Sequence, residues 1–190
     1  MIGRLTNNDF KLTKAYKEPS SNLDGNHDTA LEIRLADEAD AEALTWLNQE
    51  LLTFYGLPAR NPRSFTAHAI EKGAFNANSG LKILLAIGDH TPVGFLAFSE
   101  IFALASCQKS IFIQDLFITR KVRQSGTGRA LMQALFNFAK VNEITQIDWT
   151  TDAWNSKAIA FYEHIVPSLK TEKILYRLNK ERLNQIMNKY

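Results

Sequence analysis

Residues 111–118 read Ile-Phe-Ile-Gln-Asp-Leu-Phe-Ile, and residues 119–131 continue Thr-Arg-Lys-Val-Arg-Gln-Ser-Gly-Thr-Gly-Arg-Ala-Leu. The first stretch is apolar and typical of a strand, and the residues after Gly126 have the apolar period of a helix. The first amides of a helix have no partner within the helix, and the helix dipole adds partial positive charge there. Such a turn binds phosphate, and glycines at 126 and 128 would let the backbone approach a pyrophosphate closely.

The pattern Arg123-x-x-Gly126-x-Gly128 by itself leaves two interpretations open. Arg123 would add a charge-assisted contact to a phosphate-binding loop. Alternatively, the segment is an ordinary turn that contains two glycines. The flanking strand and helix favour the phosphate-binding interpretation.

The rest of the sequence alternates between strand and helix patterns. Apolar runs predict strands at 31–35, 81–87, 93–104, 110–119, 146–150 and 173–178. Helical periods predict a first helix that Asp37 caps and Gly56 ends, and further helices at 63–75, 126–141, 156–164 and 180–189. This order indicates one α/β domain with a mixed sheet.

Two single residues carry local predictions. Asp37 is expected to cap the first helix, with Asp40 in the place of the usual capping-box Glu. Gly94, inside a strand, predicts a bulge or a close approach of two backbones.

Composition bounds the domain plan and excludes several function classes. The 190 residues suit one domain, with a polar, poorly ordered tail at 1–30, one α/β domain at 31–178 and a C-terminal helix at 179–190. A net charge of +2 argues against nucleic-acid binding, and no apolar run reaches the roughly 18 residues of a membrane helix. The single cysteine, Cys107, cannot form an intrachain disulfide, and no secretory signal pattern is visible, so a cytoplasmic protein is expected.

The segment 111–131 resembles the coenzyme-binding region of the GNAT superfamily of N-acetyltransferases. The pyrophosphate motif of that family, Arg or Gln-x-x-Gly-x-Gly or Ala, matches Arg123, Gly126 and Gly128. The resemblance covers about 31–178. It implies a mixed, mostly antiparallel sheet flanked by helices, with one splayed pair of parallel strands that holds acetyl-CoA between them.

A second motif of the family is similar to Asn155, Ala158 and Phe161-Tyr162. The resemblance implies that Asn155 contacts the coenzyme and that Tyr162 acts as the general acid toward the departing thiolate. Asn155 is also a good N-cap for the helix that follows, and Tyr162 also suits simple packing. The coenzyme contacts implied are Leu116, Phe117, Ile118, Arg123, Gln124, Ser125, Gly126, Thr127, Gly128, Arg129, Asn155 and Tyr162.

The general base is less well defined. Many relatives carry Glu-Asp where this chain has Gln114-Asp115, and an amide cannot accept a proton. Asp115 is one candidate, although strand alternation could turn it away from the site. Glu100 is a second candidate, and transfer without a protein base is a third possibility.

The acceptor is expected to be a small, amino-acid-like amine, bound by Glu50, Tyr55 and Glu100. The loop 103–109 holds no carboxylate and Lys109 would repel a polycation, which argues against a polyamine. A protein lysine or N-terminus, or a module that binds acetyl-CoA without turnover, remain as alternatives. A dinucleotide-dependent oxidoreductase is disfavoured because the fingerprint lacks its further glycine.

No metal is expected, because His68, His90 and His164 lack metal-ligand spacing. A homodimer is plausible through the apolar side of the last helix, which carries Leu183, Ile186 and Met187.

Overall fold

A computed structural model describes residues 31–59, 61–166 and 170–189. The chain forms two compact units that divide after Thr150. The tail predicted at 1–30 lies outside the described residues, and the domain boundary at 178 stays a prediction. Among the described helices, none is both long enough and apolar enough to cross a bilayer.

The first unit is built on one five-stranded sheet with the strand order β1-β2-β3-β4-β5. Neighbouring strands are antiparallel except for β4 and β5, which run parallel, as the mixed sheet predicted from the sequence requires. The strands are β1 (Leu31–Leu35), β2 (Leu81–Gly88), β3 (Thr91–Ala103), β4 (Gln108–Ile118) and β5 (Gln146–Trp149).

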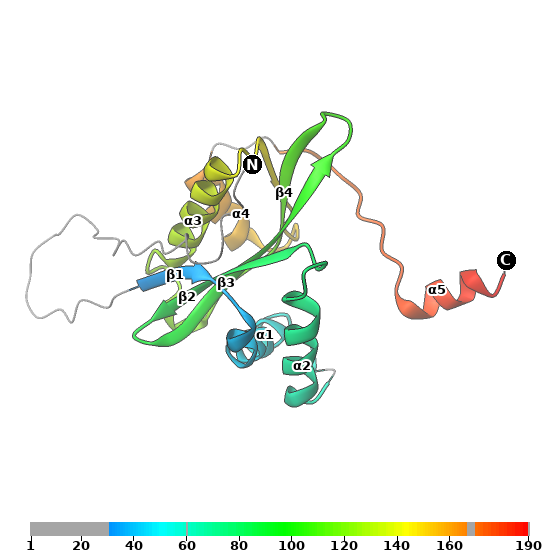
Figure 1. Ribbon diagram of the computed structural model, residues 1–190, viewed down its shortest axis with the longest axis horizontal. Helices are drawn as coiled ribbons and strands as arrows, with labels where there is room; N and C mark the ends of the chain where they lie inside the picture. The colour runs from blue at the N-terminus through cyan, green and yellow to red at the C-terminus, as the bar shows by residue number, and fades with distance from the viewer. Residues whose placement is uncertain (1–30, 60, 167–169, 190) are drawn as a thin grey trace, which may run out of the picture. The chain divides into compact units, whose positions relative to one another are not determined.

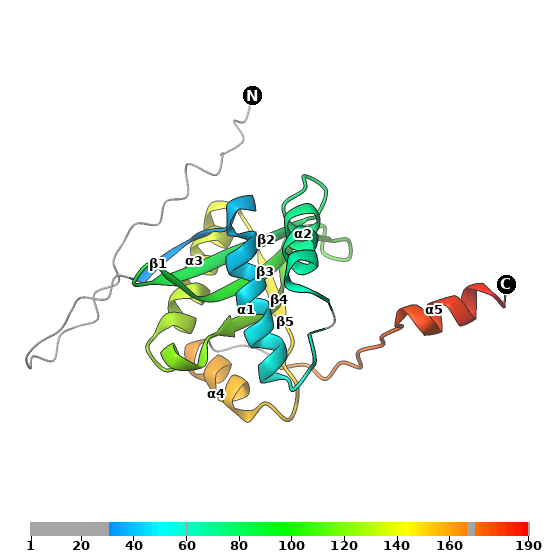
Figure 2. The same cartoon turned by 90° about the horizontal axis from the view of Figure 1, so that it is seen from below.

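Helices cover both faces of this sheet (Figure 1). One face carries α1 and α2, with α1 lying over the strands in Figure 2, and the other face carries α3. The elements of the first unit are the short 3-10 helix η2 (Glu38–Asp40), α1 (Ala41–Phe54), α2 (Arg63–Ala74), the 3-10 helix η3 (Arg120–Val122) and α3 (Thr127–Val141). The second unit contains α4 (Ser156–Ile165) and α5 (Lys180–Met187).

Strand alternation sorts the core into two layers. The layer beneath α1 and α2 consists of Ala36, Leu44, Leu47, Ile83, Leu85, Phe95, Ala97 and Phe117. On the opposite face Phe98 meets Phe138 of α3, with ring centroids 5.0 Å apart in an edge-on arrangement. Leu131 and Leu135 of α3 are fully buried, so the apolar side predicted for this helix forms the second layer.

Gly94 is required where β3 pairs with the end of β4, opposite Ile118. A β-carbon at this position would lie 2.6 Å from the carbonyl oxygen of Phe117 and 2.7 Å from Cδ1 of Ile118. The register shifts at the same point, because Ala86 pairs with Gly94 while Ile87 pairs with Pro92. Both the bulge and the close approach predicted from the sequence are therefore confirmed.

The strand predicted at 173–178 is not formed, since residues 170–179 have no regular secondary structure. A strand is stable only when its backbone groups pair with a neighbour. The described part of the second unit offers only helices, so the apolar pattern at these positions was misleading. Leu183, Ile186 and Met187 lie exposed on α5, and the homodimer stays a prediction.

The capping box predicted at the entry to α1 is confirmed, although Asp37 caps η2, which leads directly into α1. The amide of Ala39 donates to Oδ1 of Asp37, and the amide of Asp37 donates to Oδ2 of Asp40, each at 2.9 Å. Both terminal guanidinium nitrogens of Arg34 donate hydrogen bonds to the carboxylate of Asp40, at 2.6 and 2.7 Å. Burial alone would raise the pKa of Asp40, but the hydrogen bonds from Arg34 and Asp37 outweigh it and hold this pKa below its ordinary value.

The substitution Asp40→Asn is expected to lower the free energy of unfolding at pH 7 by about 1–3 kcal/mol, because it removes a charge-assisted pair. A carboxyl whose pKa is lowered on folding stabilises the protein above its unfolded pKa of about 3.9 and ceases to do so as the pH falls through the folded value. Urea unfolding at pH 7 and near pH 3 should therefore show a difference that shrinks with acid. Asp37→Asn is the control, since Asn caps as well as Asp. An equal deficit at both pH values would contradict the role of the ionised pair.

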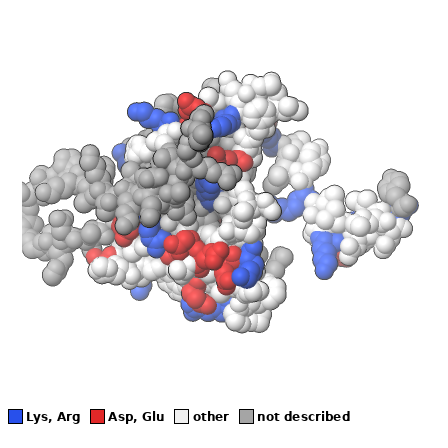
Figure 3. Space-filling model, in the orientation of Figure 1, with Lys and Arg blue, Asp and Glu red and all other residues white. Residues whose placement is uncertain are grey.

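The charges on the surface of the first unit are mixed. On the face drawn in Figure 3, acidic and basic side chains lie next to one another around α1 and α2. Arg63 pairs with Glu42 at 3.2 Å, and Lys72 pairs with Glu71 at 2.8 Å. Such exposed pairs contribute little to stability.

Candidate active site

The strand β4 carries a bulge at the centre of the candidate site. Ala97 of β3 pairs with Asp115, whereas Phe98 pairs with Ile113, so Gln114 is the extra residue. Its side-chain amide donates to the hydroxyl oxygen of Ser99 at 2.8 Å. A bulge of this kind re-aims side chains and bends the strand locally.

The register settles the face on which Asp115 lies. Residues directly opposite each other in an antiparallel ladder share one face of the sheet. Asp115 is opposite Ala97, and Phe117 is opposite Phe95, and these partners belong to the layer beneath α1 and α2. Asp115 therefore faces the side of α1 and α2.

The parallel ladder between β4 and β5 ends early. Its last pair is Ile113 with Trp149, where β5 ends, while β4 continues to Ile118. Residues 114–118 thus have no β5 partner along this edge. The open edge begins at the bulge, and this geometry is the one that a splayed strand pair requires.

Backbone alternation decides which amides face the open edge. The amide of Thr119 donates to the carbonyl of Val93 at 2.9 Å, so Thr119 and Phe117 direct their backbone groups toward β3. Leu116 and Ile118 direct theirs to the other side. The amides of Leu116, Phe117 and Ile118 were expected to contact the coenzyme. The amide of Phe117 instead points toward β3 within the sheet, and the ring of Phe117 is buried.

The loop before α3 has the backbone geometry of an anion site. Gln124 and Gly126 both have positive φ, 69° and 85°, and Gly126 is the N-cap of the helix. The first helical hydrogen bond runs from Ala130 to the carbonyl of Gly126, which leaves the amides of the first turn, at 127–129, without a partner in the helix. The hydroxyl of Ser125 donates to the carbonyl of Val122 at 2.7 Å and lies 2.9 Å from that of Thr127. These contacts hold a row of amides in place, and such a row suits a pyrophosphate group.

Arg123 opens this loop but turns toward α1. Its Nε donates to the carbonyl oxygen of Ile118 at 2.9 Å. Its guanidinium carbon lies 4.7 Å from the ring centroid of Phe54 and 5.7 Å from that of Phe117. The side chain is therefore held against two aromatic rings by cation–π contacts.

The carboxyl of Asp115 lies in a partly desolvated environment. The residue is exposed, yet enough protein surrounds the carboxyl that burial raises its pKa above the ordinary value. A raised pKa keeps a carboxylate more basic and suits a group that accepts a proton.

The predicted acceptor residues lie in different places. Glu100 forms an ion pair with Lys82 at 3.4 Å. It follows Phe98 by two residues on β3, so its side chain lies on the same face of the sheet as Phe98, the α3 face, and away from Asp115. Alternation thus separates these two carboxylates. Glu50 is half-buried on α1, about one turn after Leu47 and one turn before Phe54.

Tyr55 ends α1, and its ring meets that of Phe54 edge-on with centroids 5.2 Å apart. Phe54 is 42% exposed. No sequence motif pointed to Phe54 or Ser99. The period of α1 could have placed Phe54 beside Leu47 and Leu51, but no pattern links Ser99 to Gln114.

The second unit carries the remaining two predicted residues on α4. Oδ1 of Asn155 accepts from the amide of Ala158 at 3.1 Å, so the capping interpretation of Asn155 is confirmed. Tyr162 is half-buried, and its ring lies edge-on to that of Phe161 at 5.3 Å. Their roles toward a coenzyme stay predictions.

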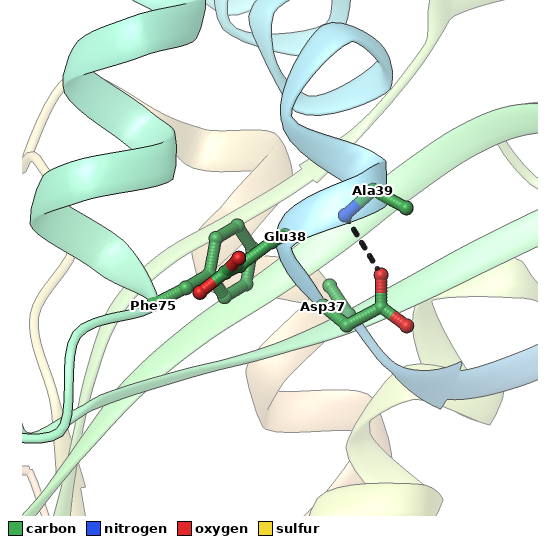
Figure 4. Close-up of a pocket in the computed structure, with 5 residues that line it drawn as sticks. Asp37, Glu38, Ala39 and Phe75 are labelled. Carbon is green, nitrogen blue, oxygen red and sulfur yellow. Dashed lines mark hydrogen bonds between the residues drawn. The ribbon is translucent and has the colours of Figure 1, made fainter.

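A surface depression at the start of α1 is separate from this site. It is lined by Ala36, Asp37, Glu38, Ala39 and Phe75. Figure 4 shows the hydrogen bond between Asp37 and the amide of Ala39, with Glu38 and Phe75 as further lining residues of the depression. The 14-residue helix α1 is about 21 Å long, so the depression lies far from Phe54 and is part of the cap. Within the described residues, no group of three or more His, Cys, Asp or Glu side chains is placed to hold a metal ion.

Together these features define an α/β protein with an open sheet edge that leads into a helix terminus whose first-turn amides suit a phosphate group. The acetyltransferase (GNAT) family model matches residues 40–165, and the chain belongs to this family.

Curated relatives and solved structures agree with this assignment. The chain is 26% identical over 87 residues to the D-amino-acid N-acetyltransferase HPA3 of Saccharomyces cerevisiae, covering 46% of this chain and 53% of that protein. It is 27% identical over 100 residues to the L-ornithine N5-acetyltransferase NATA1 of Arabidopsis thaliana, covering 53% of this chain and 44% of that protein. The matches thus span about half the length of each of these two relatives. An integron cassette protein from the mobile metagenome of V. cholerae has the same fold, with a TM-score of 0.75, 27% identity and coverage of 83% and 97% of the two chains.

Proposed function

We propose that this protein transfers the acetyl group of acetyl-CoA directly to the amine of a small, amino-acid-like acceptor. The observation that carries the proposal is the bulge in β4. It places Asp115 on the face of α1 and α2, at the start of the open edge of β4, the strand that leads through η3 into the loop 124–129.

Acetyl-CoA would supply an activated acetyl group as a thioester. The amides of the loop 124–129 suit its pyrophosphate because they are held in a row at a helix N-terminus. The amides of Leu116 and Ile118 face the open edge and would donate to the thioester oxygen as negative charge develops there. Asn155 and Tyr162 are assigned to the same ligand, with Tyr162 as the donor of a proton to the sulfur.

On the acceptor side, Asp115 would remove a proton from the ammonium group, because an amine attacks only when neutral. Its raised pKa supports this role. Glu50 and Tyr55 are assigned to acceptor binding, since both lie toward the end of α1, and Glu100 is set aside because it lies on the opposite face. The two curated relatives are named for amino-acid acceptors, which supports an amino acid over a polyamine or a protein.

A second candidate function is coenzyme binding without turnover, and Gln114 favours it. The side chain of Gln114 cannot accept a proton, and it is engaged with Ser99. Such a module would bind acetyl-CoA and acetylate none of the amines offered.

Release of coenzyme thiol in the presence of D- and L-amino acids, polyamines and a lysine peptide tests the proposal. The exposed thiol of Cys107 would react with the detection reagent, so Cys107→Ser is the form to use. We expect turnover with amino acids above that with polyamines or the peptide. Preference for spermidine or the peptide would overturn the acceptor class, and coenzyme binding without any turnover would favour the second candidate.

A further inference from the structure

The side chain of Arg123 is held on the face of the sheet that carries α1 and α2. Its Nε is occupied by the carbonyl of Ile118, and its guanidinium plane lies against Phe54 and Phe117. Phe117 belongs to the layer beneath α1 and α2, and Phe54 ends α1. These contacts hold the cation on the same face as Asp115.

The outer edge of this guanidinium is available for a ligand. Among the described residues, no carboxylate lies within 4.0 Å of Arg123, and its hydrogen bond uses Nε alone. The residue is exposed, and the ring of Phe54 beside it is 42% exposed. A stacked guanidinium loses little further conformational freedom when its two terminal nitrogens form hydrogen bonds to a planar anion.

Asp115 and Arg123 lie on one face of the sheet without pairing with each other, and this arrangement suits a ligand with one amine and one carboxylate. Asp115 and Phe117 are alternate residues on one face of β4, so their side chains begin about 7 Å apart. The guanidinium of Arg123 lies over the ring of Phe117 and does not pair with the carboxyl of Asp115. The pKa of the Asp115 carboxyl is raised by burial. An acceptor amine at Asp115 therefore leaves room for its carboxylate at Arg123.

We propose that the terminal nitrogens of Arg123 bind the carboxylate of an amino-acid acceptor whose amine lies at Asp115, so that Arg123 selects acids over uncharged amines. This inference rests on the proposed function and names its specificity-determining residue. The family motif assigns Arg123 to the pyrophosphate, but here the loop 124–129 already provides a row of amides for that group. The contacts of Arg123 with Ile118 and Phe54 draw it toward α1.

The test compares each amino acid with its own carboxamide, which keeps the amine and removes the negative charge. The pairs are D-alanine with D-alaninamide and L-ornithine with L-ornithinamide. Steady-state kcat/KM is measured for the Cys107→Ser protein and for its Arg123→Gln and Arg123→Lys variants. Arg120→Gln is the matched control, because Arg120 is an exposed arginine of η3 just before the loop. The acid-to-amide ratio cancels the difference in intrinsic amine reactivity.

We expect Arg123→Gln to lower the acid-to-amide ratio about ten- to hundredfold, as loss of a charge-assisted hydrogen-bond pair predicts, mainly through the KM of the acid. Arg123→Lys should keep part of the ratio, and Arg120→Gln should keep all of it. A binding readout that needs no turnover accompanies this one. Titration of the N-acetylated acid and its amide into coenzyme-free protein should show the same loss of discrimination.

An unchanged ratio in an active Arg123→Gln enzyme would overturn the inference and leave the proposed function standing. A rise in the KM for acetyl-CoA with an unchanged acid-to-amide ratio would mean that Arg123 binds the pyrophosphate of the coenzyme and not the acceptor. If the starting protein acetylates neither acid nor amide, the proposed function fails and this inference fails with it.

Discussion

Gly126→Asp is expected to remove acetyl-CoA binding while the protein stays folded. Gly126 is the N-cap of α3, with φ at 85°, and aspartate is tolerated in this left-handed region better than most residues. A carboxylate at a helix N-cap also stabilises the helix. The same carboxylate would repel a pyrophosphate at the first turn. Two unit charges 4 Å apart near a protein surface interact by about 4 kcal/mol, which corresponds to a loss of affinity of about a thousandfold.

Calorimetric titration of acetyl-CoA into the purified chain measures this loss, with the melting temperature as the check on folding. Gly126→Asn is the matched control, because it adds the same volume and backbone strain without the charge. Its affinity should fall far less than that of Gly126→Asp. Equal losses in both variants would mean that shape and not charge excludes the ligand. Binding by Gly126→Asp within a few-fold of the starting protein would remove the phosphate-binding loop from the proposed function.

The sequence predicted the fold well where local patterns and packing agree. The apolar runs of β2 and β3 and the apolar side of α3 placed nearly every element within two residues of its observed bounds. Asp37 and Gly94 were predictable because a cap and a close backbone approach each demand particular residue types. The segment 173–178 failed because strand propensity says nothing about whether a partner strand is present.

The site was only partly predictable, because its key feature is a slip in register. A bulge inserts one extra residue, so the side chains beyond it change faces relative to simple alternation along the strand. Amino-acid composition does not reveal the bulge, so the orientation of Asp115 could not be predicted from alternation. The motif singled out Arg123, which follows η3 and precedes the loop before α3, and its predicted contact with the pyrophosphate stays a prediction. Its stacking on Phe54 is a contact between distant segments, which only the packing of α1 on the sheet brings together.

Asp115→Asn is expected to lower kcat by about a hundredfold to ten-thousandfold, the range typical of a lost general base, with little change in acetyl-CoA affinity. Only the ionised carboxylate accepts a proton, so kcat/KM should rise with pH through the pKa of Asp115, which lies above its ordinary value of about 3.9. This lower limb should disappear in the variant, leaving the rise caused by deprotonation of the acceptor amine itself.

Stability gives an independent check on the same substitution. A carboxyl whose pKa is raised on folding is most favourable below its unfolded pKa and loses that contribution as the pH rises through the folded value. Asp115→Asn should therefore be more stable than the parent at pH 7, with a gain that vanishes in acid. Ser99→Ala, which frees Gln114 and leaves the carboxyl in place, should keep the lower limb of the pH profile. Loss of activity in Asp115→Asn without a change in the pH profile would mean that Asp115 shapes the site and that the acceptor loses its proton to water. Full activity in the variant would exclude Asp115 from the chemistry, because an asparagine side chain cannot take the proton that the amine must lose.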